Sequence, residues 1–182
     1  MDLDFLSFFR TPLKYGAIIG FIYLIQINVQ HLLRTVGFEL DPYSPYIALF
    51  FLSIGLFLGL GEHSKNTYDG RITYLEGLRT GLLITVIATF FSCLFMYVYS
   101  EYINFDWPDI QAEKLRRELS ELGTPKIEIH RKMAAVYYKF STTSRVKHQL
   151  IINMIGGSCL ALIIPLLAKR VRSGKKYSSR RF

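Results

Sequence analysis

The sequence predicts an all-α integral membrane protein, a four-helix bundle with an amphipathic helical hairpin inserted between its third and fourth helices. Three observations support this fold class. Hydrophobic residues make up 51% of the 182 residues and charged residues only 20%, a composition that excludes an intrinsically disordered chain. The apolar residues gather in four long runs. Each run is long enough for a helix to cross most or all of a membrane's hydrocarbon layer, which is about 30 Å thick.

The four runs cover residues 15–33, 46–61, 78–99 and 150–168. Three of them contain no Asp, Glu, Lys or Arg, and the third contains only Arg79, near its start. Since a helix rises about 1.5 Å per residue, we interpret each run as a transmembrane helix. The second is the shortest, and we expect it to stand upright or to recruit flanking residues. The first run is too long for the apolar part of a cleavable signal peptide, so we expect this helix to remain in the protein. We predict one membrane domain over residues 1–182.

The segment between the last two runs, residues 100–149, has the pattern of a helical hairpin. Residues 109–122 place Ile110, Leu115, Leu119 and Leu122 on one face and most charged residues on the other, and Gly123 is a favoured residue beyond a helix end. We expect Thr124 to cap the next helix and Pro125 to begin it. Such a hairpin commonly lies on the membrane or packs over the bundle. We place it on the extracytoplasmic side, where it either packs or binds a partner.

The C-terminal segment, residues 169–182, is strongly basic. Seven of its 14 residues are Lys or Arg, and they account for most of the net charge of +8. Basic residues directly after a transmembrane helix favour the cytoplasmic side, and four crossings then place the N-terminus there too. Anionic membrane lipid is the partner that we expect for this tail, because it lies adjacent. We do not expect nucleic acid as a partner.

Small residues recur at four-residue spacing in every run. In lipid, helices associate largely through close backbone contact over such residues. In the third run the stripe extends through Thr85, Ala88, Thr89 and Ser92, so we expect this helix at the centre of the bundle. The predicted packing residues are Gly16, Gly20, Gly55, Gly59, Gly77, Gly81, Thr85, Gly157 and Ala161.

Three amide side chains lie on faces that also carry small residues. Gln26 and Gln30 share the face of Gly16 and Gly20, and Asn153 shares the face of Gly157. One interpretation is that these amides hydrogen-bond between helices, for about 0.6 to 2 kcal/mol each. The other is a polar vestibule that contacts a lipid headgroup or a small solute. The runs contain no deep charged residue of the kind that marks most proton or ion pathways.

The sequence carries no pattern of a catalytic or metal site. The motifs HExxH, GxxxxGK[ST], GxSxG and CxxC do not occur, and the four histidines are scattered. Cys93 and Cys159 lie inside apolar runs, where a thiol behaves as a small hydrophobe. Glu76 and Arg79 are three residues apart at a helix start, which favours an ion pair. We therefore predict a protein that is not an enzyme, with no catalytic, cofactor-binding or metal-binding residue and no cofactor.

Two segments stand out beside the third run, YDGRITYLEGLRTG at residues 68–81 and YINFD at residues 102–106. They resemble the DUF4199 family of small bacterial inner-membrane proteins of unknown function. Phe105 stands where many members of the family have Pro. The resemblance implies a multi-pass protein of the bacterial inner (cytoplasmic) membrane with both termini in the cytoplasm. It implies no reaction, cofactor or catalytic residue.

Two classes of function fit these features. The first is a non-enzymatic scaffold or accessory subunit of a cell-envelope membrane complex, binding a membrane-protein partner or a second copy of itself. The alternative is a small transport or lipid-handling protein that uses the polar vestibule and assists lipid-linked sugar metabolism. Purification in mild detergent distinguishes them, because the first class retains a stoichiometric partner and the second a lipid or solute.

Overall fold

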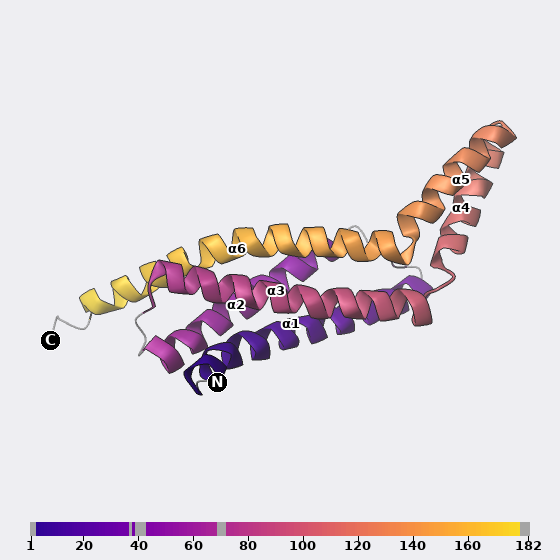
Figure 1. Ribbon diagram of the computed structural model, residues 1–182. Helices are drawn as coiled ribbons and strands as arrows, with labels where there is room; N and C mark the ends of the chain where they lie inside the picture. The colour runs from indigo at the N-terminus through magenta and orange to yellow at the C-terminus, as the bar shows by residue number, and fades with distance from the viewer. Residues whose placement is uncertain (1–2, 37, 39–42, 69–71, 179–182) are drawn as a thin grey trace. The chain divides into compact units, whose positions relative to one another are not determined.

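The computed structural model describes the backbone of residues 3–36, 38, 43–68 and 72–178, and within these the side chains of 8–36, 38, 43–67 and 72–167. This part of the chain is helical and contains no strand, which confirms the predicted all-α class. Its elements are α1 (Leu3–Thr35), α2 (Ser44–Tyr68), α3 (Tyr74–Val98), the π-helical turn η2 (Tyr99–Ile103), α4 (Trp107–Glu121), α5 (Lys126–Phe140) and α6 (Thr142–Ser178) (Figure 1).

Four helical segments are long and apolar enough to cross a membrane. They are Phe8–Thr35, Ser44–Thr67, Tyr74–Ile103 and Thr142–Leu167. All four exceed the apolar runs; the second has 24 residues instead of the predicted 16. The backbone stays helical past the last apolar residue because polar side chains near the ends interrupt no helical hydrogen bond. The protein is therefore a multi-pass helical membrane protein, with longer helices than the hydrophobic pattern predicts.

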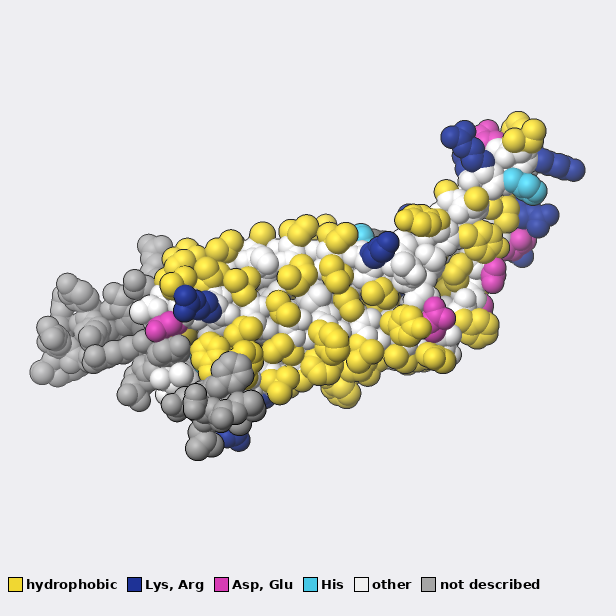
Figure 2. Space-filling view, viewed as in Figure 1, with side chains coloured by type: hydrophobic (Ala, Val, Ile, Leu, Met, Phe, Trp, Pro, Cys, Tyr) yellow, Lys and Arg dark blue, Asp and Glu magenta, His cyan; other side chains and the backbone are white. Residues whose placement is uncertain are grey.

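The chain forms two compact units, residues 1–92 with 151–182 and residues 93–150. The sequence predicts one domain with an insert at 100–149; the second unit is larger than that insert and includes the end of α3 and the start of α6. The first unit is the bundle, and its buried core comprises Ile19, Leu52, Leu56, Leu60, Ile84, Ala88 and Ile164. Hydrophobic side chains also cover most of the bundle face seen in Figure 2. The side chains of the basic tail lie outside the described residues.

Glycines of three helices let those helices approach α3. A Cβ atom placed on Gly16 of α1 would lie 2.6 Å from Ile87 Cγ2, and one on Gly59 of α2 would lie 2.8 Å from Ile84 Cδ1. On Gly157 of α6, a Cβ atom would overlap the Thr85 side chain. Since real side chains do not tolerate such contacts, only glycine fits these positions without a shift of its neighbours.

The remaining predicted small residues also lie at helix contacts. From α3, a Cβ atom on Gly77 would lie 3.0 Å from Pro165 Cβ, and one on Gly81 would lie 3.1 Å from Ala161 Cβ, both in α6. Gly20 faces Phe91, and Gly55 faces Ile19. Helix α3 thus contacts α1, α2 and α6 through small residues or through side chains that face glycine.

The second unit contains the α4–α5 hairpin. Among its described residues, Ala112, Leu119 and Ile129 are buried apolar residues. Leu122, expected on the face of Leu119, is instead 79% exposed, because α4 ends at Glu121 and Leu122 already belongs to the turn. Gly123 has a φ of +69°, the left-handed conformation that favours glycine after a helix. The prediction that Thr124 caps α5 is wrong, because Pro125 is the residue before its first turn. Pro125 accepts hydrogen bonds at its carbonyl from the backbone N–H groups of Glu128 and Ile129. Its ψ of 140° is extended, so the helix starts one residue later, at Lys126.

A π-helical turn, η2, follows α3 and includes the first two residues of the YINFD segment. The backbone N–H of Asn104 donates a hydrogen bond to the Tyr99 carbonyl over 2.9 Å, which closes a turn one residue wider than that of an α-helix. Tyr99, Ser100 and Asn104 are buried, and the Arg145 guanidinium lies 5.5 Å from the Tyr99 ring centre. The wider turn moves the chain out of the α3 hydrogen-bond pattern before α4 begins.

Candidate functional site

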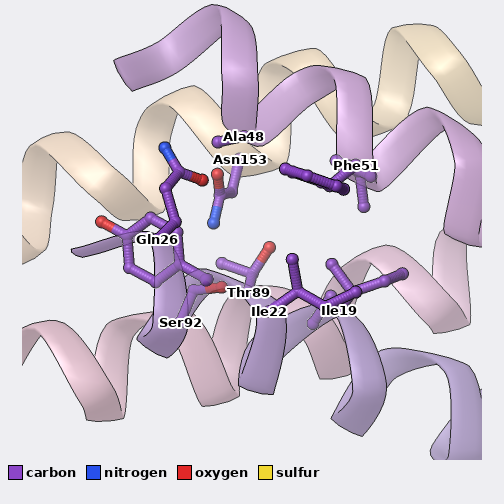
Figure 3. A pocket seen from close by; sticks show the side chains of 11 residues that line it. Ile19, Ile22, Gln26, Ala48, Phe51, Thr89, Ser92 and Asn153 are labelled. Carbon is purple, nitrogen blue, oxygen red and sulfur yellow. The ribbon is translucent and has the colours of Figure 1, made fainter. Parts of the chain in front are cut away.

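A small cavity lies inside the bundle, between α1, α2, α3 and α6 (Figure 3). Its volume is about 10 Å³, measured as the space that the centre of a water molecule can occupy. This is room for about one water. Its lining residues are Ile19, Ile22, Tyr23, Gln26, Ala48, Phe51, Leu52, Ala88, Thr89, Ser92 and Asn153. These described lining residues include no Asp, Glu, Lys, Arg or His.

Helix periodicity brings the polar lining residues to the cavity. Gln26 follows Ile19 by seven residues on α1, so both lie on one face. Thr89 continues the small-residue stripe of α3 four residues after Thr85, and Asn153 precedes Gly157 by four residues on α6. Figure 3 shows the amides of Gln26 and Asn153 and the hydroxyls of Thr89 and Ser92 around the same space.

Hydrogen bonds to Ser44 connect α1 to the start of α2. The Gln26 Nε2 group donates to the Ser44 carbonyl over 3.0 Å, and the Ser44 hydroxyl donates to Gln30 Oε1 over 3.3 Å. Gln26 therefore contributes both to a hydrogen bond between helices and to the cavity wall. Of the three predicted vestibule residues, Gln26 and Asn153 meet at the cavity, whereas Gln30 lies outside its lining.

Two polar atoms of the cavity wall are unsatisfied. Within the described residues, Gln26 Oε1 and Thr89 Oγ1 have no hydrogen-bond partner. Gln26 is 9% exposed and Thr89 is 4% exposed. Leaving such a group buried and unpaired costs about 1–3 kcal/mol. The wall thus presents a carbonyl acceptor from α1 and a hydroxyl from α3, an arrangement suited to a small polar molecule.

The sequence pattern predicts only part of this cavity. It places Thr89 and Ser92 in a stripe of small packing residues, and it gives no signal for Ser44. The sequence signal for Thr89 was its position on the face of Thr85. Thr85 donates to the Gly81 carbonyl over 2.9 Å within its own helix, so equal spacing on one helix leads to different surroundings for the two hydroxyls.

A second polar group joins α1 and α2 away from the cavity. The Lys14 ammonium lies 2.8 Å from Glu62 Oε2, and the Tyr15 hydroxyl donates to the same oxygen over 2.8 Å. The Lys14 and Glu62 side chains are 51% and 31% exposed, so their pairing contributes little to stability. The next residue, His63, is fully buried, with its ring centre 5.1 Å from that of Phe8.

At the start of α3, Glu76 caps the helix. Its carboxylate accepts hydrogen bonds from the Thr73 amide over 2.8 Å and from the Thr73 hydroxyl over 2.7 Å. This is the reciprocal arrangement of a capping box, in place of the simple ion pair with Arg79 that the spacing favours. Among the described residues, no group of three or more His, Cys, Asp or Glu side chains could hold a metal ion.

Four helices long and apolar enough to cross a membrane, around a cavity without a charged residue in its described lining, define a helical multi-pass membrane protein. A family model described as "Protein of unknown function (DUF4199)" matches residues 14–170, most of the chain. The protein belongs to this family, which confirms the family that the sequence resembles. No curated protein and no solved structure matches the chain.

Proposed function

We propose that the protein is a non-enzymatic scaffold or accessory subunit of a membrane complex. The observation that supports this proposal is the exposure of large apolar side chains on the α4–α5 hairpin, which belongs to none of the four candidate spans. Leu122 is 79% exposed and Ile127 is 87% exposed, at the two ends of the turn. Tyr138 is 74% exposed. Large apolar side chains outside the membrane favour contact with another protein.

The bundle supports the same proposal through its tight interior. Glycines on α1, α2 and α6 contact α3 so closely that added methyl groups would overlap their neighbours. The cavity between these helices has room for about one water. Such an interior is suited to a rigid support, and this cavity is too small to hold a lipid headgroup.

Charge on the hairpin favours a protein partner over nucleic acid. Lys132 Nζ lies 2.9 Å from Glu128, and Arg117 Nε lies 3.2 Å from Glu113, so each helix pairs one of these basic groups with an acid. Binding to nucleic acid depends on unpaired basic groups that neutralise phosphates. We further propose a bacterial inner-membrane location with both termini cytoplasmic, the hairpin extracytoplasmic, and the basic tail on anionic lipid, following the charge distribution of the sequence.

Purification of the tagged full-length protein from its own membranes in mild detergent tests the proposal. The wild type should retain a protein at fixed stoichiometry, either another membrane protein or a second copy. The double variant Leu122→Ser/Ile127→Ser should lose it at least several-fold, because the exposed apolar contacts are gone. The matched control, Glu121→Ser/Lys126→Ser, changes exposed charged residues of the same turn and should retain the partner.

The alternative function is small-solute transport or lipid handling, including assistance to lipid-linked sugar metabolism. The polar cavity at Gln26 and Asn153 is the observation that favours it. In the same purification, mass spectrometry would then find a bound lipid or solute on a protein without a partner. That result would contradict the scaffold proposal and favour the alternative.

A further inference from the structure

We propose that the cavity between α1, α2, α3 and α6 binds one water molecule that joins α1 to α3. The water donates a hydrogen bond to Gln26 Oε1 and accepts one from the Thr89 hydroxyl. Its site is built into the bundle independently of any partner or transported solute, and it gives the polar lining residues a structural role inside the bundle.

The unsatisfied atoms define the chemistry of the ligand. Gln26 Oε1 can only accept a hydrogen bond, so the ligand must carry a donor. The Thr89 hydroxyl can donate a hydrogen bond, so the ligand must also offer a lone pair that accepts it. Both atoms line the same cavity and have no partner in the described part of the chain. Water meets both requirements, since buried waters typically form two to four hydrogen bonds.

Volume and charge restrict the ligand to water. The cavity has space for the centre of about one water-sized molecule, which excludes a sugar, a lipid headgroup or a metabolite. A small cation such as ammonium would fit by size. However, the described lining residues carry no carboxylate, and an unpaired ion in such a site would lose far more hydration energy than two neutral oxygens return.

Burial explains why this water would be retained. Gln26 and Thr89 are each more than nine-tenths buried, and Ala88 and Leu52 beside them are also buried. The Gln26 amide is also held in place by the hydrogen bond from its Nε2 group to the Ser44 carbonyl. The acceptor therefore keeps its direction toward the cavity, and the bound water links two helices that glycines already hold in contact.

Water-edited solid-state NMR of the full-length protein in lipid bilayers tests this directly. The measurement is the rate of magnetisation transfer from water to signals of the cavity residues Ile22, Ala88 and Ser92. In the wild type the transfer should be fast, although these residues lie inside the bundle. Thr89→Val keeps the side-chain shape but removes the hydroxyl, and the transfer should fall several-fold.

Two further variants make the result specific. Thr85→Val is the matched control, because the Thr85 hydroxyl donates within α3 and Thr85 does not line the cavity; it should leave the transfer unchanged. Thr89→Ser retains the hydroxyl and should keep the water, so it serves if Thr89→Val fails to fold. A wild-type protein without fast transfer at these three residues, or a folded Thr89→Val protein with unchanged transfer, would overturn the proposal.

Discussion

At the scale of single residues, two glycines with the same helical conformation have opposite surroundings. A Cβ atom on Gly157 of α6 would overlap Thr85 and approach Leu52 to 3.2 Å. A Cβ atom on Gly61 of α2 would meet nothing within 4 Å. The physical cost of adding one methyl group is therefore set by the neighbouring helix and not by the residue type.

Substitution of these two glycines by alanine tests the close packing. Gly157→Ala should lower the free energy of unfolding by about 1–3 kcal/mol, because the added methyl group overpacks the α3–α6 contact. Gly61→Ala should be neutral or raise it by up to about 1 kcal/mol, since alanine restricts the unfolded chain more than glycine does. Thermal unfolding in detergent measures both. Equal melting temperatures for the two variants would contradict the contact at Gly157.

Asp109 controls the ionisation of Tyr137 in the hairpin. The hydrogen bond between the Tyr137 hydroxyl and the Asp109 carboxylate raises the pKa of that tyrosine above its ordinary value of 10.0, and burial adds to this. A pKa raised in the folded state stabilises the fold below pH 10, and this contribution is lost as the pH rises through the folded value.

Asp109→Asn should therefore lower the pKa of Tyr137 toward its ordinary value, because an amide interacts less strongly with the hydroxyl proton than a carboxylate does. Titration of the ring carbon signals of labelled tyrosine by NMR measures this pKa. Glu121→Gln on the same helix is the control and should leave it unchanged. An unaltered Tyr137 titration in Asp109→Asn would show that the hydrogen bond does not form.

At the scale of elements, the α4–α5 hairpin depends on few buried side chains. Leu119 is 7% exposed, Ala112 is 1% exposed and Ile129 is 8% exposed. The Trp107 and Phe140 rings meet edge to face with centres 6.3 Å apart, at the other end of the hairpin. A pair of helices with so small an interior should respond strongly to the loss of one side chain.

Leu119→Ala removes a buried side chain and should destabilise the hairpin by about 2–5 kcal/mol. Amide hydrogen exchange should then accelerate across residues 107–140, while exchange within α1 and α2 stays as in the wild type, because those helices belong to the other compact unit. Leu122→Ala is the control, since Leu122 is 79% exposed. Exchange rising equally in all helices would argue against an independently packed hairpin.

At the scale of the whole molecule, the proposed orientation rests on charge. Seven basic residues between 169 and 182 follow the last candidate span directly. The described part of the chain contains four candidate spans, and an even number of crossings would place both ends on one side. Following the positive-inside tendency, we propose that this side is the cytoplasm.

Cysteine labelling in spheroplasts measures the orientation. After replacement of Cys93 and Cys159, Ser179→Cys should resist an impermeant thiol reagent, because the proposed orientation places the tail inside the cell. Ser120→Cys in the hairpin should react. Permeabilised cells provide the control in which both positions react. Labelling of position 179 without labelling of position 120 in intact spheroplasts would reverse the orientation.

The sequence by itself determined the class of protein and the residues available for packing. Four long apolar runs, with Arg79 as their one charged residue, suffice to predict membrane-spanning helices, because the energy of placing charge in hydrocarbon leaves few other arrangements. Glycine and alanine at four-residue spacing indicate which faces can approach closely. Both signals are local, since each depends on residues within one helix. Helix ends were less predictable, because hydrophobicity marks the membrane boundary and the backbone continues beyond it.

Only the tertiary structure decided which polar residues share a site. Gln26, Thr89 and Asn153 belong to three helices, and their meeting depends on the rotation and depth of each helix. Gln30, on nearly the same face as Gln26, instead accepts a hydrogen bond from Ser44. Thr85 and Thr89 differ likewise: one hydroxyl bonds within its helix and the other faces the cavity. Such differences arise from contacts between helices, which the periodicity of a single helix does not contain.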